Sequence, residues 1–234
     1  MEEVVEEEAA AEAEGLPFTT LTLMRSVGNN FLFRGPEQTV HLGNSSGAFD
    51  YAGLRWQMRL EAPALPKDFY LVDVCLLNHQ DDVRDESIER AFFEKNPGKG
   101  RFQWWPTNGT ALDAYNASAA AATARVRAWT NASAWIDPLP WWTDALDALL
   151  RTPRAGGVAT VVYVHCQGGK DRTGEVAGSY YMRHMNLTLQ QATTRDHKIA
   201  GRAIGHGNQL AMEWYCLYLR DVLGYGLACP KPVV

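Results

Sequence analysis

The part of the sequence that most constrains the fold is the abrupt change in residue character between residues 158–165 and residues 166–172. The first segment, VATVVYVH, gives the strongest strand signal of the chain, because it is almost continuously apolar and rich in β-branched residues. The second segment, CQGGKDR, is polar with two adjacent glycines, and a helical pattern begins near Thr173. A buried strand that leads through a glycine-containing loop into a helix is typical of an α/β protein.

The same alternation of strands and helices covers most of the chain. Residues 68–78 form a nearly unbroken apolar run and predict a second buried strand, and residues 100–107 predict a shorter one. Residues 29–43 predict a further strand and a turn. We expect helices at residues 111–129, 138–152, 172–185, 187–199 and 208–224. The sequence therefore predicts an α/β fold, with a central, largely parallel, twisted sheet flanked by helices and the loop at 166–172 between a central strand and a helix.

Length and charge limit the organisation of the chain and its partners. With 234 residues and 46% hydrophobic content, the chain can bury one sizeable core, so we expect a single domain at residues 16–234 with a helical insertion at about 107–134. Residues 1–15 carry seven Glu and no basic residue and predict a disordered acidic tail. The net charge of −5 argues against nucleic acid as a partner. No apolar run reaches the roughly 18 residues of a membrane-spanning helix, so we expect no transmembrane segment.

Two features point to different compartments. Asn-x-Ser/Thr sequons begin at Asn44, Asn108, Asn116, Asn131 and Asn186, where about one is expected by chance. They indicate either a glycosylated protein of the secretory pathway or a coincidence in a Thr-rich and Ala-rich sequence. A reactive thiol favours the cytoplasm instead, so the localisation stays open.

The four cysteines do not form a pattern that predicts a disulfide scaffold or a zinc site. They are few and scattered, and no CxxC pair occurs. A bridge between Cys216 and Cys229 is expected only if the compartment is oxidising.

The loop after residue 165 contains the groups that a phosphate site needs. Gly168 and Gly169 can adopt backbone angles that are closed to other residues, so that several N–H groups point inward. The helix that follows adds the positive end of its dipole, and Arg172 offers a planar fork for two phosphate oxygens. Cys166 adds a nucleophile, because N–H groups, a helix N-terminus and an arginine favour its thiolate form.

Residues 165–174, HCQGGKDRTG, resemble the HCx5R signature of the cysteine-dependent protein tyrosine phosphatase superfamily. The GKDRTG ending is similar to a subgroup of dual-specificity and bacterial-type phosphatases, some of which also dephosphorylate phosphoinositides. The resemblance implies that Cys166 is the nucleophile and that Arg172 binds the phosphate. The expected phosphate-binding residues are Gln167, Gly168, Gly169, Lys170, Asp171, Arg172 and Thr173, and His165 is expected to fix the loop by bonding to the backbone around the cysteine.

Such phosphatases use an aspartate on an upstream loop as the general acid. The segment AWIDPLPWW resembles their Trp-Pro-Asp loop, with Ile136 in place of the proline, and Asp137 lies 29 residues before Cys166. Asp137 is therefore the favoured acid, and Asp113 and Asp171 are the alternatives. Further downstream, Gln209 is similar in position to the glutamine that orients the hydrolytic water in this family.

The resemblance implies hydrolysis of phosphomonoesters through a phosphocysteine intermediate. We expect a dual-specificity-type tyrosine phosphatase, with a phosphoinositide phosphatase as the alternative, because Lys170 can contact a second phosphate or simply face solvent. A pseudophosphatase that binds phosphorylated ligands, and redox or sulfur-transfer chemistry, are less favoured. The expected partners are phosphorylated proteins or phosphoinositides. No metal and no organic cofactor is expected, because the loop amides and Arg172 supply the charge stabilisation.

Overall fold

The structure is a computed structural model that describes residues 21–42, 46–78 and 83–231. The expected acidic tail at residues 1–15 and the sequon at Asn44 lie outside the described residues. The chain divides into two compact units. The first unit comprises Met1–Pro106 and Leu150–Gly168, and the second comprises Thr107–Leu149 and Gly169–Val234.

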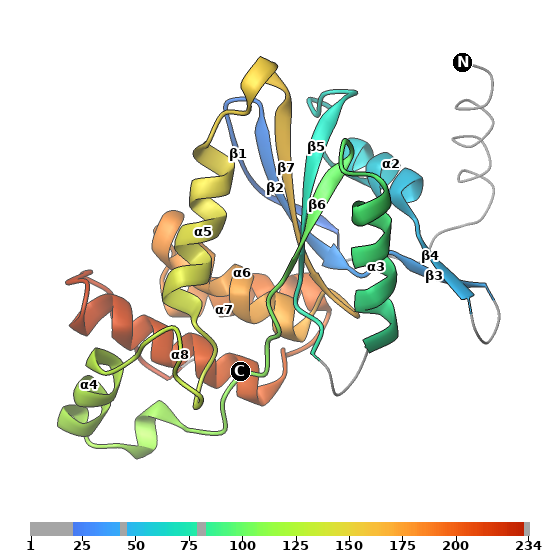
Figure 1. The fold of residues 1–234 in the computed structure, drawn as a ribbon. Helices are drawn as coiled ribbons and strands as arrows, with labels where there is room; N and C mark the ends of the chain where they lie inside the picture. The colour runs from blue at the N-terminus through green and yellow to red at the C-terminus, as the bar shows by residue number, and fades with distance from the viewer. Residues whose placement is uncertain (1–20, 43–45, 79–82, 232–234) are drawn as a thin grey trace, which may run out of the picture. The chain divides into compact units, whose positions relative to one another are not determined.

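The first unit is built on a five-stranded sheet with the strand order β1-β2-β7-β5-β6 (Figure 1). Strands β2, β7, β5 and β6 are parallel, and β1 runs antiparallel to β2 at the edge. The buried run at 158–165 forms the central strand β7, every residue of which is buried. The strands are β1 (Thr22–Val27), β2 (Asn30–Pro36), β5 (Phe69–Cys75), β6 (Gly100–Trp104) and β7 (Ala159–Cys166).

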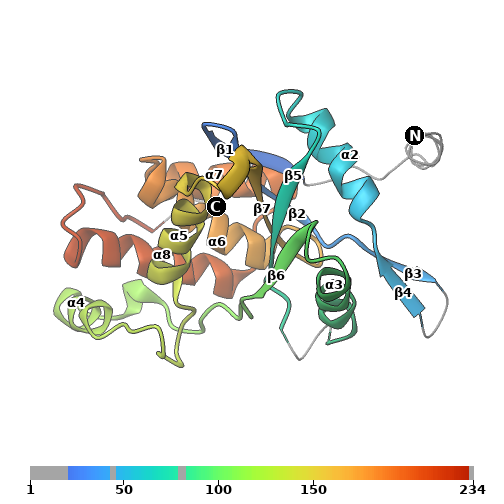
Figure 2. The same ribbon diagram turned by 45° about the horizontal axis from the view of Figure 1, so that its top comes forward.

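Two helices and a β-hairpin complete the first unit. The helices are α2 (Tyr51–Glu61) and α3 (Val83–Lys95), a single 3₁₀ turn spans Ala155–Gly157, and the hairpin consists of β3 (Thr39–Leu42) and β4 (Ser46–Phe49). Figures 1 and 2 both show the hairpin beside α3, with which it makes contacts.

One face of the sheet forms the core of the first unit. Phe33, Leu71 and Tyr163 project from this face and pack against Leu54 and Met58, which lie one turn apart on α2. Leu54 and Met58 are completely buried, and each such side chain contributes about 1.5–3 kcal/mol by leaving water. Because side chains alternate along a strand, the residues two positions beyond Leu71 and Tyr163 lie on this same face.

The second unit is helical. Helix α6 packs against α7 and α8, and α4 packs against α8. Its elements are a 3₁₀ turn η1 (Ala114–Asn116), α4 (Ala119–Arg127), α5 (Leu139–Arg151, of which the last two residues belong to the first unit), α6 (Asp171–His184), α7 (Leu189–Ala200) and α8 (His206–Asp221). A disulfide joins Cys216 in α8 to Cys229.

The expected helix at residues 111–129 is wrong in its first half. The Asp113 side chain accepts a hydrogen bond from the Tyr115 N–H and caps η1, and the chain is then extended until Ser118 caps α4 by accepting from the Ala121 N–H. Both side chains bond to their local backbone, and this competes with a continuous helix.

The predicted fold class is confirmed. The described residues form a mixed α/β protein with a central, mostly parallel sheet and seven α-helices, α2 to α8. None of the helices in the described part of the chain is both long and apolar enough to cross a membrane.

Candidate active site

Strand β7 carries Cys166 to the carboxyl edge of the sheet. Cys166 is the last residue of the strand, is only 3% exposed and is not part of a disulfide. Its carbonyl oxygen accepts a hydrogen bond of 2.8 Å from the N–H of Glu37, the residue that follows the neighbouring strand β2. The backbone around the thiol is therefore held by both β2 and β7.

Four residues, Gln167 to Lys170, connect β7 to helix α6. Gly169 adopts a positive φ of 62°, which a residue with a Cβ atom adopts only with strain. Helix α6 begins at Asp171, and the Lys170 carbonyl accepts a bond of 2.8 Å from the Gly174 N–H. Arg172 is thus the second residue of a 14-residue helix, where N–H groups without a helical acceptor are available to an anion.

His165, the penultimate residue of β7, contacts two acidic side chains. Its Nε2 atom is 3.1 Å from Oδ1 of Asp73 in β5 and 3.5 Å from Oε2 of Glu89 in α3, and all three side chains are fully buried. Burial lowers the pKa of His165, but the charges of Glu89 and Asp73 outweigh it and raise the pKa to about 9. The expected bond from His165 to the backbone is not among the hydrogen bonds of the described residues.

Asp137 lies in the second unit, immediately before α5, and is nearly buried. Its Oδ2 atom accepts hydrogen bonds from the N–H groups of Gly109 at 2.6 Å and Asn108 at 2.8 Å. Burial raises the pKa of Asp137 above its usual value, although bonds from Gly109, the Glu175 carboxyl group and Asn108 act in the opposite direction. Asp137 therefore keeps its proton to a higher pH than a solvated aspartate does.

Glu175, in the first turns of α6, is the carboxyl partner of Asp137. It is completely buried, and its Oε2 atom accepts a bond of 2.7 Å from Nδ2 of Asn208 in α8. Burial raises the pKa of Glu175 well above its usual value, and the charge of Asp137 raises it further. Both effects favour the protonated form of Glu175.

The two alternative acids have the opposite environment. Asp171 accepts bonds of 2.7 Å from both Nη atoms of Arg202 and one of 2.6 Å from the Gly205 N–H, and the Arg202 bonds lower its pKa. At Asp113 burial is the largest single effect and raises the pKa, but the bonds from the Tyr115 N–H and from Lys231, together with the charge of Lys231, outweigh it, so the pKa of Asp113 is lowered as well. Of the three candidates, Asp137 alone has an environment that favours the protonated form.

Gln209 lies in the first turn of α8 and is mostly buried. Its Nε2 atom donates a hydrogen bond of 3.2 Å to Oε1 of Glu213, one turn further along the same helix. The described contact of this side chain is thus an internal bond of α8.

Sequence reasoning missed four polar residues around the candidate site residues. Asp73 and Glu89 surround His165, and Glu175 and Asn208 support Asp137. Asp73 stands inside the apolar run FYLVDVC, and an unexplained charge in a buried strand is the signal that could have drawn attention to it. Glu89, Glu175 and Asn208 lie in helices with ordinary polar patterns and carry no such signal.

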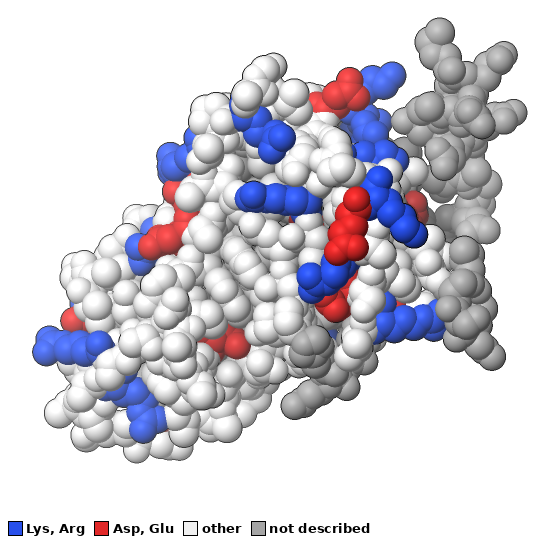
Figure 3. All heavy atoms as spheres, in the orientation of Figure 1, with Lys and Arg blue, Asp and Glu red and all other residues white. Residues whose placement is uncertain are grey.

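Charges are mixed on the part of the surface that Figure 3 shows. Basic and acidic side chains lie next to one another in the region of α3 (Figure 3), and the sequence of this helix, VRDESIERAFFEK, contains both kinds. This face offers no large field of one sign to steer a polyanion.

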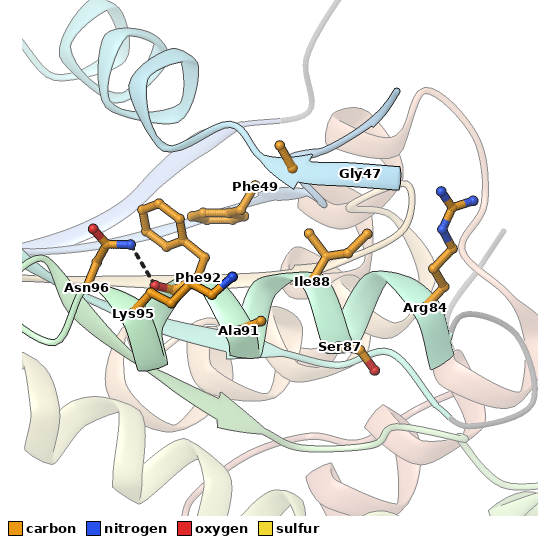
Figure 4. Close-up of a pocket in the computed structure, with 10 residues that line it drawn as sticks. Gly47, Phe49, Arg84, Ser87, Ile88, Ala91, Phe92, Lys95 and Asn96 are labelled. Atoms are coloured by element: carbon orange, nitrogen blue, oxygen red, sulfur yellow. Dashed lines mark hydrogen bonds between the residues drawn. The ribbon is translucent and has the colours of Figure 1, made fainter. Parts of the chain in front are cut away.

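A pocket of about 640 Å³ lies between the hairpin β3–β4 and α3. Figure 4 shows Phe49, Ile88 and Phe92 at its apolar centre and Arg84 and Lys95 toward its ends. The signature residues 165–174 do not line it. No pattern in the sequence predicted this pocket.

The comparisons with known proteins give structural similarities only. No protein-family model matches the chain, and no curated protein sequence matches it. The core catalytic domain of the PP-IP phosphatase SIW14 from S. cerevisiae is similar over 77% of this chain and 86% of its own, with 16% identity and a TM-score of 0.40. PTPMT1 in complex with PI(5)P is similar over 83% of this chain and 95% of its own, with 12% identity and a TM-score of 0.45. TpbA from P. aeruginosa in complex with pTyr is similar over 80% of this chain and 94% of its own, with 18% identity and a TM-score of 0.34.

Proposed function

We propose that the protein is a phosphomonoester hydrolase that uses Cys166 as a nucleophile and forms a phosphocysteine intermediate. The observation that carries the proposal is the continuous sequence of a buried central strand ending at Cys166, a four-residue loop with two glycines, and a helix whose second residue is Arg172. Aryl phosphates and phosphotyrosine are the proposed substrates, as for a dual-specificity-type tyrosine phosphatase.

In the first step, Arg172 and the loop N–H groups bind the phosphate oxygens, and the Cys166 thiolate attacks phosphorus. A sulfur–phosphorus bond forms, and the bond from phosphorus to the leaving oxygen breaks. Asp137 gives its proton to that oxygen, because an alkoxide or phenolate is a poor leaving group. The raised pKa of Asp137 supports this role, since it maintains the protonated form.

In the second step, the Asp137 carboxylate takes a proton from water, which attacks the phosphocysteine and releases phosphate. The N–H groups of Gly109 and Asn108 stabilise the carboxylate that exists between the two steps. Gln209 remains a candidate for orienting the water, although its bond to Glu213 gives it a role within α8.

Replacement of the nucleophile tests the proposal. Cys166→Ser is expected to lower the turnover of p-nitrophenyl phosphate by about 10³-fold or more, because serine is not ionised at neutral pH. Phosphate binding, measured by calorimetry, should remain. Intact-mass measurement of the wild-type chain, quenched during turnover, should detect one added phosphoryl group that the variant lacks.

Arg172 offers a second test with a matched control. Arg172→Lys keeps the charge but loses the bidentate fork, so both phosphate affinity and turnover should fall. Arg154→Lys, an exposed arginine that stacks on Tyr70, should leave both unchanged. If Cys166→Ser keeps turnover within about tenfold of the wild type, the covalent mechanism is wrong. If binding persists in a wild-type chain without turnover, the protein is a pseudophosphatase.

A phosphoinositide phosphatase is the second candidate. Lys170 supports it, because this half-buried cation directly precedes the helix that begins with Asp171 and Arg172, where it can meet a second phosphate. Lys170→Met should then lower kcat/KM for a multiply phosphorylated inositol lipid much more than for phosphotyrosine. Equal losses would assign Lys170 to general electrostatic attraction and favour the aryl phosphate substrate.

A further inference from the structure

Four side chains that can bind metals meet on one face of the sheet in the first unit. Asp73 and Cys75 are two positions apart in β5 and therefore lie on the same face. His165 in β7 is the register partner of Cys75, and Glu89 belongs to α3. All four residues are completely buried, with an exposed fraction of 0%.

Three of the four side chains have donor atoms that all lie near one another, and the fourth, Asp73, lies near His165. Sγ of Cys75, a carboxylate oxygen of Glu89 and a ring nitrogen of His165 all lie within 4.8 Å of one another. Oδ1 of Asp73 is 3.1 Å from Nε2 of His165, and Oε2 of Glu89 is 3.5 Å from the same atom. Ligand atoms about 2.0–2.3 Å from a tetrahedral ion are separated by roughly 3.3–3.7 Å, so small side-chain movements are sufficient.

Within the described chain, the two carboxylates of the cluster lack the hydrogen-bond partners that buried carboxylates usually have. Among the described residues, the four carboxylate oxygens of Asp73 and Glu89 accept no well-formed hydrogen bond, and neither group pairs with a lysine or an arginine. In the described part of the chain, the basic group that contacts them is the imidazole of His165. Two buried carboxylates beside a single imidazole are costly, and a divalent cation would remove that cost.

We propose that Asp73, Cys75, Glu89 and His165 form a buried structural site for one zinc ion. A set of one thiolate, one imidazole and two carboxylates suits Zn²⁺, whereas Mg²⁺ and Ca²⁺ prefer oxygen ligands alone. Binding deprotonates the Cys75 thiol, and the proton leaves to solvent. The ion would tie β5, β7 and α3 together directly behind the strand end that carries Cys166.

The site is independent of the proposed phosphatase activity, and its test does not measure turnover. The full chain is purified under reducing conditions without chelators, and its zinc content is measured by mass spectrometry of the elements. One zinc per chain is expected. The zinc is then replaced by Co²⁺, which should give the visible bands of a tetrahedral site together with a near-ultraviolet thiolate-to-cobalt band.

Variants identify the ligand cysteine. Cys75→Ser should abolish the thiolate-to-cobalt band, and Glu89→Gln should lower metal affinity by about 10-fold or more. Cys166→Ser, which removes the other free thiol, should keep one zinc per chain and the full cobalt spectrum. Glu86→Gln is the matched control, because Glu86 lies one turn earlier on α3 and pairs with Arg90 instead of the cluster.

Two results would overturn the proposal. A folded wild-type chain that contains no zinc and gives no tetrahedral cobalt spectrum would mean that His165 is a protonated imidazole between two carboxylates. A cobalt band that disappears in Cys166→Ser and persists in Cys75→Ser would place the ion at the nucleophile. If Cys75→Ser does not fold, the zinc content of Cys166→Ser still tests the proposal. One zinc per chain supports the site, and no zinc excludes it.

Discussion

At the scale of single residues, burial distinguishes Asp137 from the two alternative acids, Asp113 and Asp171. Asp113 and Asp171 have partners that lower their pKa values, whereas Asp137 is buried near Glu175 and has a raised pKa. In the sequence all three are aspartates near turns, and nothing in their neighbours distinguishes a solvated carboxylate from a buried one. The partners Arg202, Lys231 and Glu175 all lie 31 or more positions along the chain from the aspartates they contact.

The pH dependence of turnover tests the acid. Because the pKa of Asp137 is raised, its protonated form persists to a higher pH, and turnover of substrates with poor leaving groups should fall as pH rises through that pKa. Asp137→Asn should lower kcat for phenyl phosphate by about 10²-fold or more and remove this fall. Asp144→Asn, in the half-exposed pair with Arg183, is the control. If Asp113→Asn or Asp171→Asn removes the fall of turnover at high pH and Asp137→Asn does not, the residue changed in that variant is the general acid.

Glu175→Gln separates stability from catalysis. The pKa of Glu175 is raised in the folded state, so its contribution to stability is complete below its unfolded pKa and is lost as pH rises through the folded pKa. Glutamine cannot ionise and still bonds to Asp137 and Asn208. The variant should match the wild type at about pH 4 and have a higher Tm at alkaline pH, as measured by calorimetry. A lower Tm at alkaline pH would mean that Glu175 is ionised in the fold.

At the scale of elements, the strands with continuous apolar runs were predicted well and the polar helices less well. The runs at 158–165 and 68–78 became β7 and β5, because burial on both faces leaves few alternatives for such a segment. The Ala-rich segment at 111–129 has high helix propensity, yet local side-chain caps divide it. The part that remains helical, α4, packs on α8, and helix propensity carries no information about such packing.

Helix α6 approaches side chains of α7 and α8 closely at Gly178. A Cβ atom on Gly178 would lie 2.2 Å from Cε of Met212 in α8 and 2.5 Å from Oδ2 of Asp196 in α7. Gly178→Ala should therefore lower the free energy of unfolding by about 1–3 kcal/mol, measured by urea denaturation. Gly226→Ala is the control, because its added Cβ atom meets nothing within 4 Å. Equal stability of the two variants would show that α6 is free to shift.

At the scale of the whole molecule, the sequence could not reveal which distant groups meet. The strand, loop and helix around Cys166 follow from local pattern, and so does the fold class. The cluster at His165 combines residues from β5, α3 and β7, and no spacing rule links positions 73, 75, 89 and 165. Long-range placement of this kind comes from the sheet register and from helix packing.

The disulfide between Cys216 and Cys229 gives a prediction for the whole fold. It closes a short loop of 13 residues and ties the C-terminal segment to α8, so its reduction should lower the free energy of unfolding by about 2–3 kcal/mol. Dithiothreitol should lower the Tm of the wild type and leave that of a Cys216→Ser/Cys229→Ser double variant unchanged. An equal response of both proteins would mean that the bridge does not form in solution.

The coexistence of this bridge with a nucleophilic thiol has a consequence for how the protein responds to its surroundings. The four described sequons begin at exposed asparagines, so an oxidising, glycosylating compartment is compatible with the surface. A strong reductant would keep Cys166 active but open the bridge, and a strong oxidant would preserve the bridge but inactivate Cys166. Activity should therefore persist at reducing potentials and fall at oxidising ones, whereas the Tm should fall at reducing potentials, so the protein is both active and bridged in the range between the two.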